Sequence, residues 1–211
     1  MNTAMERIFL SSGRKRETAV GVFEDAAVFA AQKHNGMKRK LDGKPYILHP
    51  MEAALIASTM TADDEVLAAA VLHDVVEDTD AELSDIEAGF GARVAALVAS
   101  ETENKREGIP KSESWLIRKM ESLRELESTE DTAVKILWLS DKLSNMRSLH
   151  REWERMGDEV WSCFNQKDPA KHAAYYRRIA ELLIELSQYD AWREYIGLVE
   201  AVFKGVPGEA V

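Results

Sequence analysis

The chain has 211 residues, of which 45% are hydrophobic and 30% are charged, a balance typical of a globular protein with one large or two small domains. Its formal net charge of −10 argues against broad binding to nucleic acid. The sequence contains no uncharged apolar run of about 18 residues, which argues against a transmembrane helix.

The cellular compartment is indicated by the N-terminus and by the cysteine content. Residues 1–16 lack the apolar segment of a signal peptide. A single cysteine, Cys163, excludes a disulfide within the chain and is typical of the reducing cytoplasm, where we expect the protein. Because Cys163 lies between Trp161 and Phe164, we expect a packed structural thiol rather than a nucleophile.

Apolar residues recur at helical spacing along most of the chain, and no strand-like alternation or internal repeat appears. We therefore expect an all-α fold, a single bundle of about eight to ten helices over residues 1–211, with 1–16 and 205–211 as flexible ends. Between the helices, 103–112 is expected to be a loop that could act as a lid, and 151–168 an irregular segment rich in aromatic residues. Six helices are expected at 17–33, 50–60, 113–126, 132–150, 169–189 and 191–203. Three more lie between the second and the third of these: the first begins at 61–64 and carries 73–79, the next ends at 89–91, and the last runs through 94–98 and ends near 102.

Several short motifs predict where helices begin and end. His34-Asn35-Gly36 predicts a helix C-terminus. Thr61-x-x-Asp64 and Ser84-Asp85-Ile86-Glu87 each predict a capping box at a helix N-terminus. Pro50 predicts a helix that begins directly after His49, which we expect in extended geometry.

The most informative stretch begins at His73-Asp74, after the apolar run 66–72. On a continuing helix, residues advance by about 100° each. The four residues that would then share one side are His73, Asp74, Glu77 and Asp78. Burying such ionisable groups without partners is costly, and a divalent metal would compensate them. This stretch alone is equally compatible with a helix end whose acidic face is solvated.

Further ligand candidates lie elsewhere in the chain. His49 is held beside Pro50 at a helix start, and Asp141 lies in the expected apolar helix 132–150, four residues before Asn145 on the same face. A carboxylate in such surroundings needs a partner. Taken together, two histidines and two carboxylates would form a mixed nitrogen and oxygen set suited to Mn, Fe or Zn. The set is His49, His73, Asp74 and Asp141.

This set resembles the H…HD…D pattern of the HD-domain metal-dependent phosphohydrolases. Longer segments resemble the hydrolase domain of the Rel/SpoT alarmone enzymes, namely residues 46–50, 73–79 and 139–147. Residues 161–167 and 175–177 resemble the stand-alone small alarmone hydrolases, so the resemblance covers nearly the whole chain past residue 17. The Glu77-Asp78 pair after the HD doublet separates this group from most other HD enzymes.

The resemblance implies an enzyme of the stringent response that removes the 3′-pyrophosphate of (p)ppGpp, giving GDP or GTP and pyrophosphate, commonly with Mn²⁺. It implies His49, His73, Asp74 and Asp141 as the metal ligands. It implies Glu77 and Asp78 as the pair that orients and deprotonates the attacking water. We expect a monofunctional hydrolase, because 211 residues leave no room for a synthetase or regulatory domain.

The resemblance also implies residues that contact the substrate, and these are Lys38, Arg39, Lys40, Asn145, Lys171 and Tyr175. The arginine would pack on the guanine, and the two lysines beside it would balance phosphate charge. The asparagine resembles the amide that binds the ribose or the scissile phosphate. The last two residues, four apart on one helical face, resemble a phosphate-binding pair.

Two alternatives stay open. The same metal centre could remove the 2′-phosphate of NADPH, as animal relatives in this group do, or act on another nucleotide. A nucleotide sensor with an HD fold but no activity would be expected to lack a metal ligand or the Glu77-Asp78 pair, and all six positions are filled here. The expected partner is in each case a small nucleotide, with no nucleic acid and no membrane.

Overall fold

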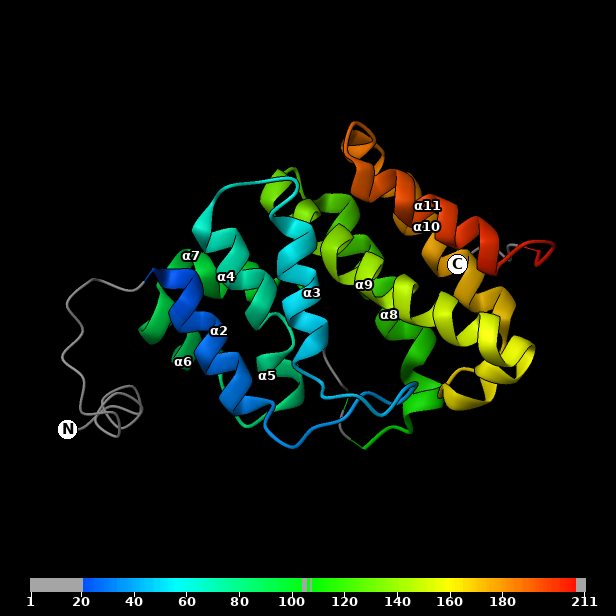
Figure 1. The fold of residues 1–211 in the computed structure, drawn as a ribbon, viewed down its shortest axis with the longest axis horizontal. Helices are drawn as coiled ribbons and strands as arrows, with labels where there is room; N and C mark the ends of the chain where they lie inside the picture. The colour runs from blue at the N-terminus through cyan, green and yellow to red at the C-terminus, as the bar shows by residue number, and fades with distance from the viewer. Residues whose placement is uncertain (1–20, 104–105, 107, 208–211) are drawn as a thin grey trace.

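The computed structural model describes residues 21–103, 106 and 108–207, and Figure 1 shows them as an assembly of helices. The α-helices are α2 (Val22–Lys33), α3 (Leu48–Ala57), α4 (Asp64–Leu72), α5 (Val75–Asp78), α6 (Leu83–Phe90), α7 (Ala92–Ala99), α8 (Lys111–Ser128), α9 (Thr132–Met156), α10 (Pro169–Leu182) and α11 (Asp190–Val202). Two 3-10 helices are η1 (Gly157–Cys163) and η2 (Ile184–Leu186). Within the described ranges, strand-type pairing is limited to one bridge between Lys38 and Pro45. The all-α prediction is confirmed.

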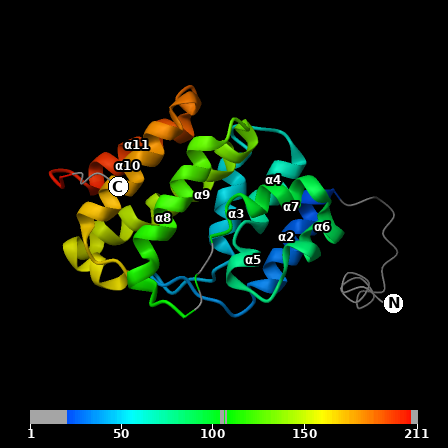
Figure 2. The same ribbon diagram turned by 180° about the vertical axis from the view of Figure 1, so that it is seen from behind.

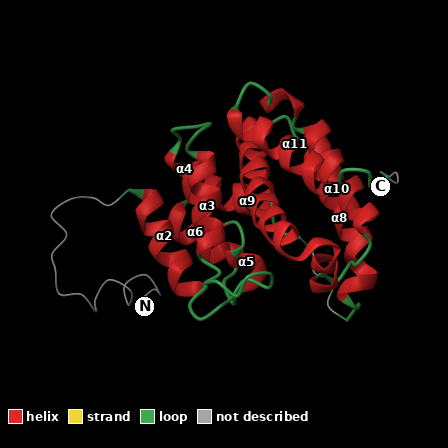
Figure 3. Cartoon of the chain, turned by 45° about the vertical axis from the view of Figure 1, so that its right-hand side comes forward, coloured by secondary structure: helices red, strands yellow, loops and turns green. Residues whose placement is uncertain are grey.

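The helix α9 lies at the centre of the molecule. It packs against α3, α4 and α7 and also against α11 and η1. Figures 1, 2 and 3 show the N-terminal helices on one side of α9 and α8, α10 and α11 on the other. The carboxylate of Asp131 caps the first turn of α9 by accepting a hydrogen bond from the amide of Ala133 at 2.8 Å. The predicted end at residue 150 is wrong, since the helix continues to Met156 and ends only at Gly157, whose φ is 59°.

The hydrophobic core runs through α9 and α4. Leu137, Leu139, Leu143 and Met146 of α9 are fully buried, in a cluster that extends from α2 to α11. Asp141 lies in the middle of this apolar sequence and is only 5% exposed. The core therefore surrounds a carboxylate, which requires compensation by a nearby positive charge or by hydrogen bonds.

The chain turns between α4 and α5, so the prediction of one continuous helix through residues 73–79 is wrong. The Nδ1 atom of His73 lies 2.8 Å from the carbonyl oxygen of Ala70. A continuing helix would offer this carbonyl to the amide of Asp74, so the imidazole competes with the helical hydrogen bond. Val75 is fully buried behind the turn. As a result, His73 and Asp74 lie in a tight turn and not on a straight helical face.

Three predicted helix starts differ from the structure. At α4, Asp63 is the capping residue and accepts from the amide of Glu65 at 3.0 Å. At α6, the capping box is formed by Glu82 and Asp85. These carboxylates replace the predicted caps of residues 61–64 and 84–87, because an aspartate or glutamate nearer the first turn satisfies the free amides. At α3, the helix begins two residues before Pro50, which the first turn tolerates since its amides have no helical partner.

The C-terminal third is more helical than predicted. Residues 151–156 belong to α9, whereas α10 ends at Leu182 and not at residue 189. Cys163 is exposed, so the prediction of a packed thiol is wrong. In the 3-10 helix η1, three residues make a turn, and Val160 and Trp161 take the buried side.

Some predictions fall outside the described part of the chain. These concern residues 17–20 of the first expected helix, the flexible ends 1–16 and 208–211, and residues 104–105 and 107 of the expected lid. Among the helices that are described, none combines the length and the apolar character that crossing a membrane requires.

Candidate active site

Two histidines and two aspartates converge from three parts of the fold. His49 lies in the first turn of α3, His73 and Asp74 lie between α4 and α5, and Asp141 lies in the middle of α9. The two histidine Nε2 atoms are 3.3 Å apart. The Oδ1 atom of Asp141 lies 3.0 and 3.5 Å from these nitrogens, and the Oδ2 atom of Asp74 lies 3.4 and 3.2 Å from them.

The outer hydrogen bonds of both imidazoles determine which nitrogen faces the cluster. Nδ1 of His73 contacts the carbonyl oxygen of Ala70 at 2.8 Å, and a carbonyl can only accept, so Nδ1 carries the proton. Nδ1 of His49 contacts the Oγ atom of Ser144 at 2.8 Å, and this hydroxyl donates to Glu52 Oε2 at 2.7 Å. Both Nε2 atoms therefore present lone pairs to each other and to two carboxylates.

Such a donor set fits a divalent metal ion. Nitrogen and oxygen ligands lie about 2.1 Å from a bound ion, which places tetrahedral ligands roughly 3.4 Å apart. The observed separations of 3.0 to 3.5 Å match that spacing. His49, His73 and Asp141 form a buried group in which ligand atoms all lie within 4.8 Å of one another, and Asp74 stands beside it. Two lone pairs and two carboxylates that face one another require a cation between them.

The charges of the cluster also favour a bound cation. Burial opposes ionisation of Asp74 and Asp141, but the imidazoles beside both and the ammonium of Lys142 beside Asp141 hold the pKa of each carboxyl well below its usual range. Burial also opposes a charged imidazole at His73, yet the carboxylates of Asp74 and Asp141 outweigh it and raise its pKa, so a proton on Nε2 competes with a metal ion for this position. The site thus holds two ionised carboxylates that attract positive charge.

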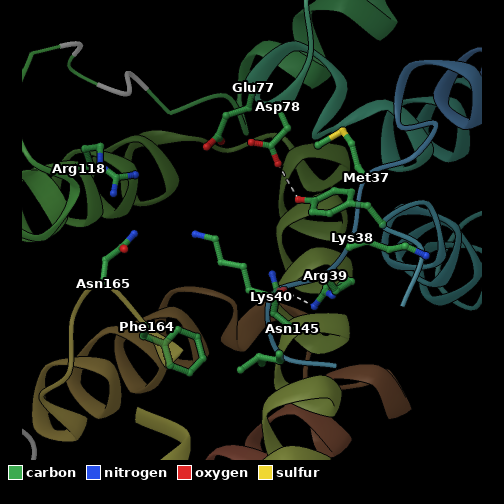
Figure 4. A pocket seen from close by; sticks show the side chains of 12 residues that line it. Met37, Lys38, Arg39, Lys40, Glu77, Asp78, Arg118, Asn145, Phe164 and Asn165 are labelled. Carbon is green, nitrogen blue, oxygen red and sulfur yellow. Dashed lines mark hydrogen bonds between the residues drawn. The ribbon is translucent and has the colours of Figure 1, made fainter. Parts of the chain in front are cut away.

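Tyr46 joins this cluster to the Glu77-Asp78 pair of α5. Its hydroxyl lies 2.7 Å from Oδ2 of both Asp74 and Asp78. Burial first, and then these two carboxylates, raise the pKa of the phenol, so Tyr46 stays a donor. The contact fixes Asp78 beside Asp74, and Figure 4 shows Glu77 and Asp78 directed into the same cavity.

The cavity in front of α5 has a volume of about 410 Å³. Its lining residues are Met37, Lys38, Arg39, Lys40, Leu41, Tyr46, Glu77, Asp78, Arg118, Asn145, Phe164 and Asn165. A smaller cavity of about 190 Å³ lies over His49, His73, Asp74 and Asp141, which we call the metal-type cluster. The two cavities share five lining residues, so the two spaces are contiguous. Apolar, cationic and acidic groups therefore surround one space large enough for a nucleotide.

A short loop presents the predicted basic residues. The backbone pairs Lys38 with Pro45, and the amide of Arg39 donates to Lys44 at 2.9 Å. The guanidinium of Arg39 lies 6.0 Å from the ring centre of Tyr46 and donates to Asn145 Oδ1 at 3.2 Å. In Figure 4, Lys40 extends into the cavity, whereas the ammonium of Lys38 points away from it.

Asn145 links that loop to the metal-type cluster. Its Oδ1 atom accepts from Arg39, and its Nδ2 atom donates to Asp141 Oδ1 at 2.6 Å. The predicted placement of Asp141 and Asn145 on one face is therefore confirmed. Both hydrogen bonds orient the amide at the edge of the cavity.

The other two predicted substrate contacts lie farther back. Tyr175 is buried, its hydroxyl has no hydrogen-bond partner among the residues that the structure describes, and its ring lies 5.0 Å from Lys119 Nζ. Lys171 is half-buried on α10. Neither residue belongs to the lining of the two cavities. Tyr175 thus contacts Lys119, which lines the smaller cavity, and the phosphate-binding role of Lys171 and Tyr175 stays a prediction.

The sequence did not single out a second group of charged residues beside the cluster. Arg118 and Lys119 of α8 pair with Glu103 at 2.6 and 2.7 Å. Lys142 pairs with Asp141 and lies 3.5 Å from Glu101. Burial raises the pKa of Glu101 to about 8. In the sequence these residues look like ordinary charges on solvated helices, and only the packing of α8 and α9 brings them to the cavity.

Comparison with known proteins identifies relatives of the chain. The model of a family described as HD domain matches residues 26–170. The mouse protein guanosine-3′,5′-bis(diphosphate) 3′-pyrophosphohydrolase MESH1 is 42% identical over 130 residues, which cover 60% of this chain and 69% of the relative. An Aquifex aeolicus protein named guanosine-3′,5′-bis(diphosphate) 3′-pyrophosphohydrolase is 40% identical over 121 residues, and the match spans 57% of this chain but only 17% of that relative.

Solved structures of similar proteins agree with these matches. A metazoan orthologue of SpoT, described as hydrolysing ppGpp and as having a role in starvation responses, has a TM-score of 0.69 at 26% identity. That match covers 90% of this chain and 98% of the orthologue. A protein of Listeria monocytogenes EGD-e has a TM-score of 0.64 at 34% identity, covering 77% of this chain and 98% of the other.

Proposed function

The chain belongs to the HD domain family, and we propose that it hydrolyses (p)ppGpp to GDP or GTP and pyrophosphate by removing the 3′-pyrophosphate. The observation that carries the proposal is the convergence of His49, His73, Asp74 and Asp141 to separations of 3.0 to 3.5 Å beside a basic cavity. We also propose that the protein is cytoplasmic, where its nucleotide substrate would be found. The chain is proposed to form a single domain.

His49, His73, Asp74 and Asp141 would hold the metal ion, for which we propose Mn²⁺. A bound divalent ion acidifies water and neutralises charge on phosphoryl oxygens. The buried carboxylates supply the negative charge that attracts the ion, and the Nδ1 hydrogen bonds of both imidazoles direct their Nε2 atoms at it.

We propose that Glu77 and Asp78 orient the attacking water and remove its proton. Tyr46 holds Asp78 beside Asp74, and Glu77 lines both cavities. A carboxylate there can accept the proton as water attacks the phosphorus next to the ribose 3′-oxygen. Direct attack needs no covalent intermediate: the bond between this phosphorus and the 3′-oxygen breaks, the 3′-oxygen takes up a proton from solvent, and GDP and pyrophosphate are released.

The cations of the cavity suit a substrate with two pyrophosphate groups. Arg39 and Lys40 lie on the loop side, where the nucleoside would bind. On the opposite side, Arg118, Lys119 and Lys142 line the space over the metal-type cluster and would neutralise the charge of the 3′-pyrophosphate under attack. A sensor without activity is less consistent with this arrangement, because ligands, acidic pair and cations all converge on one space.

Hydrolysis of ppGpp in ¹⁸O-labelled water tests the proposal. With Mn²⁺, the products are expected to be GDP and intact pyrophosphate, with the label in pyrophosphate, and EDTA should stop the reaction. Mass spectrometry of the products measures this. Label in GDP, or orthophosphate as the first product, would contradict the proposed bond cleavage. Faster turnover of NADPH to NADH and phosphate would replace the proposal by a 2′-phosphatase.

Arg39 is expected to contribute to substrate binding more than to chemistry. Its planar guanidinium, held by Asn145 over Tyr46, offers a stacking surface for the base. A cation–π contact of about 1–2 kcal/mol predicts that Arg39→Ala raises KM for ppGpp by roughly 5- to 30-fold, with a smaller change in kcat. Lys44→Ala in the same loop is the control, since its side chain pairs with Asp42 and lies outside the cavity lining. An unchanged KM in the Arg39 variant would exclude this contact.

A further inference from the structure

A chain of hydrogen bonds leads from His49 to Glu52. The imidazole Nδ1 of His49 contacts Ser144 Oγ at 2.8 Å, and the Ser144 hydroxyl donates to Glu52 Oε2 at 2.7 Å. Ser144 is fully buried on α9, whereas the side chain of Glu52, on α3, is about one quarter exposed. The contacts therefore connect the cluster to the surface across the packed pair of α3 and α9.

The direction of these hydrogen bonds follows from the chemistry of the groups. A carboxylate can only accept, so the single proton of the Ser144 hydroxyl goes to Glu52. The serine oxygen is then left to accept from Nδ1–H of His49, which leaves Nε2 with a lone pair directed at His73 and Asp141. His73 obtains the same orientation from the carbonyl of Ala70. The His49 tautomer thus depends on two side chains, and that of His73 on the backbone.

Glu52 is itself held in place. Its Oε1 atom lies 3.3 Å from Nη1 of Arg147, one turn along α9 from Ser144. The other two nitrogens of this guanidinium donate to both carboxylate oxygens of Glu194 on α11, each at 2.6 Å. A bidentate pair of this kind fixes the guanidinium in one geometry. Arg147 therefore holds the Glu52 carboxylate in contact with Ser144.

We propose that Ser144 and Glu52 are positioning residues that hold His49 in the tautomer and orientation needed to bind the metal. This inference rests on the proposed metal centre. Neither residue lies close enough to act on substrate, since neither belongs to the lining of the two cavities. Their effect is expected through metal affinity, because partners of metal-binding histidines are commonly worth on the order of 10- to 100-fold in affinity.

The first test measures metal affinity without substrate, by calorimetric titration of Mn²⁺ into the metal-free protein. Ser144→Ala is expected to weaken binding on the order of 10- to 100-fold. Ser140→Ala is the matched control, because Ser140 is equally buried on the same helix but donates to the carbonyl of Ile136. Affinity in Ser144→Ala equal to that of the control would overturn the proposal. No Mn²⁺ binding by the wild-type protein would instead overturn the metal centre and the proposed function with it.

A double-mutant cycle separates the hydrogen-bond chain from a general effect of charge. Glu52→Ala alone is expected to weaken Mn²⁺ binding, but in the Ser144→Ala protein the same change should have little further effect. If Glu52→Ala weakened Mn²⁺ binding in the Ser144→Ala protein as much as in the wild-type protein, Glu52 would act through its negative charge alone. That result would overturn the proposed hydrogen-bond chain. Because the Glu52 side chain is partly exposed, Glu52→Ala alone tests whether Glu52 supports metal binding even if Ser144→Ala does not fold, and wild-type Mn²⁺ affinity in this variant would overturn the proposal.

A spectroscopic signature follows the hydrogen bond itself. In the protein loaded with diamagnetic Zn²⁺, the Nδ1 protons of His49 and His73 should both exchange slowly with water and appear in proton NMR spectra. Ser144→Ala is expected to lose the slow exchange of the His49 proton and to keep that of His73, whose partner is the backbone. Loss of both signals, or retention of both, would contradict a specific role of Ser144.

Discussion

Replacing Asp141 by alanine is expected to remove bound metal and activity together. Its Oδ1 atom lies 3.0 Å from Nε2 of His49 and 3.5 Å from that of His73, so the change deletes one of four converging donors. It also leaves the buried ammonium of Lys142 without its nearest carboxylate. Removing one partner of a buried ion pair costs about 3–5 kcal/mol. Applied to the pair of the Asp141 carboxylate and the metal ion, this cost predicts metal binding weaker by roughly 10²- to 10⁴-fold, with kcat/KM falling at least as far.

Elemental analysis of the purified variant and calorimetric titration of Mn²⁺ measure this effect. His73→Ala is expected to behave in the same way, because its Nε2 atom contacts the same carboxylates. Asp64→Ala, at an exposed position in the first turn of α4, is the control and should keep full occupancy. Full metal content in both the Asp141 and the His73 variants would exclude this cluster as the metal site.

The residues of this cluster could be identified from sequence because their chemistry conflicts with their surroundings. Asp141 interrupts an apolar stretch of α9, and His73-Asp74 ends the buried run of α4. Such positions need compensation wherever the chain places them. The turn between α4 and α5 was not predicted, since it depends on the contact between the His73 imidazole and the carbonyl of Ala70. Residue type therefore predicted the donors, but not the geometry that brings them together.

The surrounding residues carried no comparable signal. Arg118 and Lys119 belong to a helix rich in both charges, and such a pattern usually means a solvated face. Ser144 lies between Leu143 and Asn145 as an ordinary helical serine, and its contact with His49 arises only when α3 packs against α9. The caps of α4 and α6 show the same limit at short range, because several neighbouring acidic or hydroxyl side chains could have served. Contacts between distant segments decide these roles, and periodicity does not encode them.

Glu77→Gln is expected to lower kcat on the order of 10²- to 10⁴-fold, the range of general acid–base catalysis. The glutamate lies on α5, one turn past His73, and lines both the nucleotide-sized cavity and the space over the metal-type cluster. Figure 4 shows its carboxylate directed into the cavity, next to that of Asp78, which Tyr46 holds toward Asp74. A glutamine has nearly the same shape but cannot take a proton from water.

The reaction should therefore slow without loss of binding. Metal content and KM for ppGpp are expected to stay close to those of the wild-type protein, since the four donor atoms and the basic loop are unchanged. Steady-state kinetics and elemental analysis of the same preparation measure both quantities. Glu87→Gln, the same substitution at an exposed position on α6, controls for the change in net charge. A Glu77 variant with wild-type kcat would rule out proton transfer by this residue, and one that lost its metal would make Glu77 part of the metal site instead.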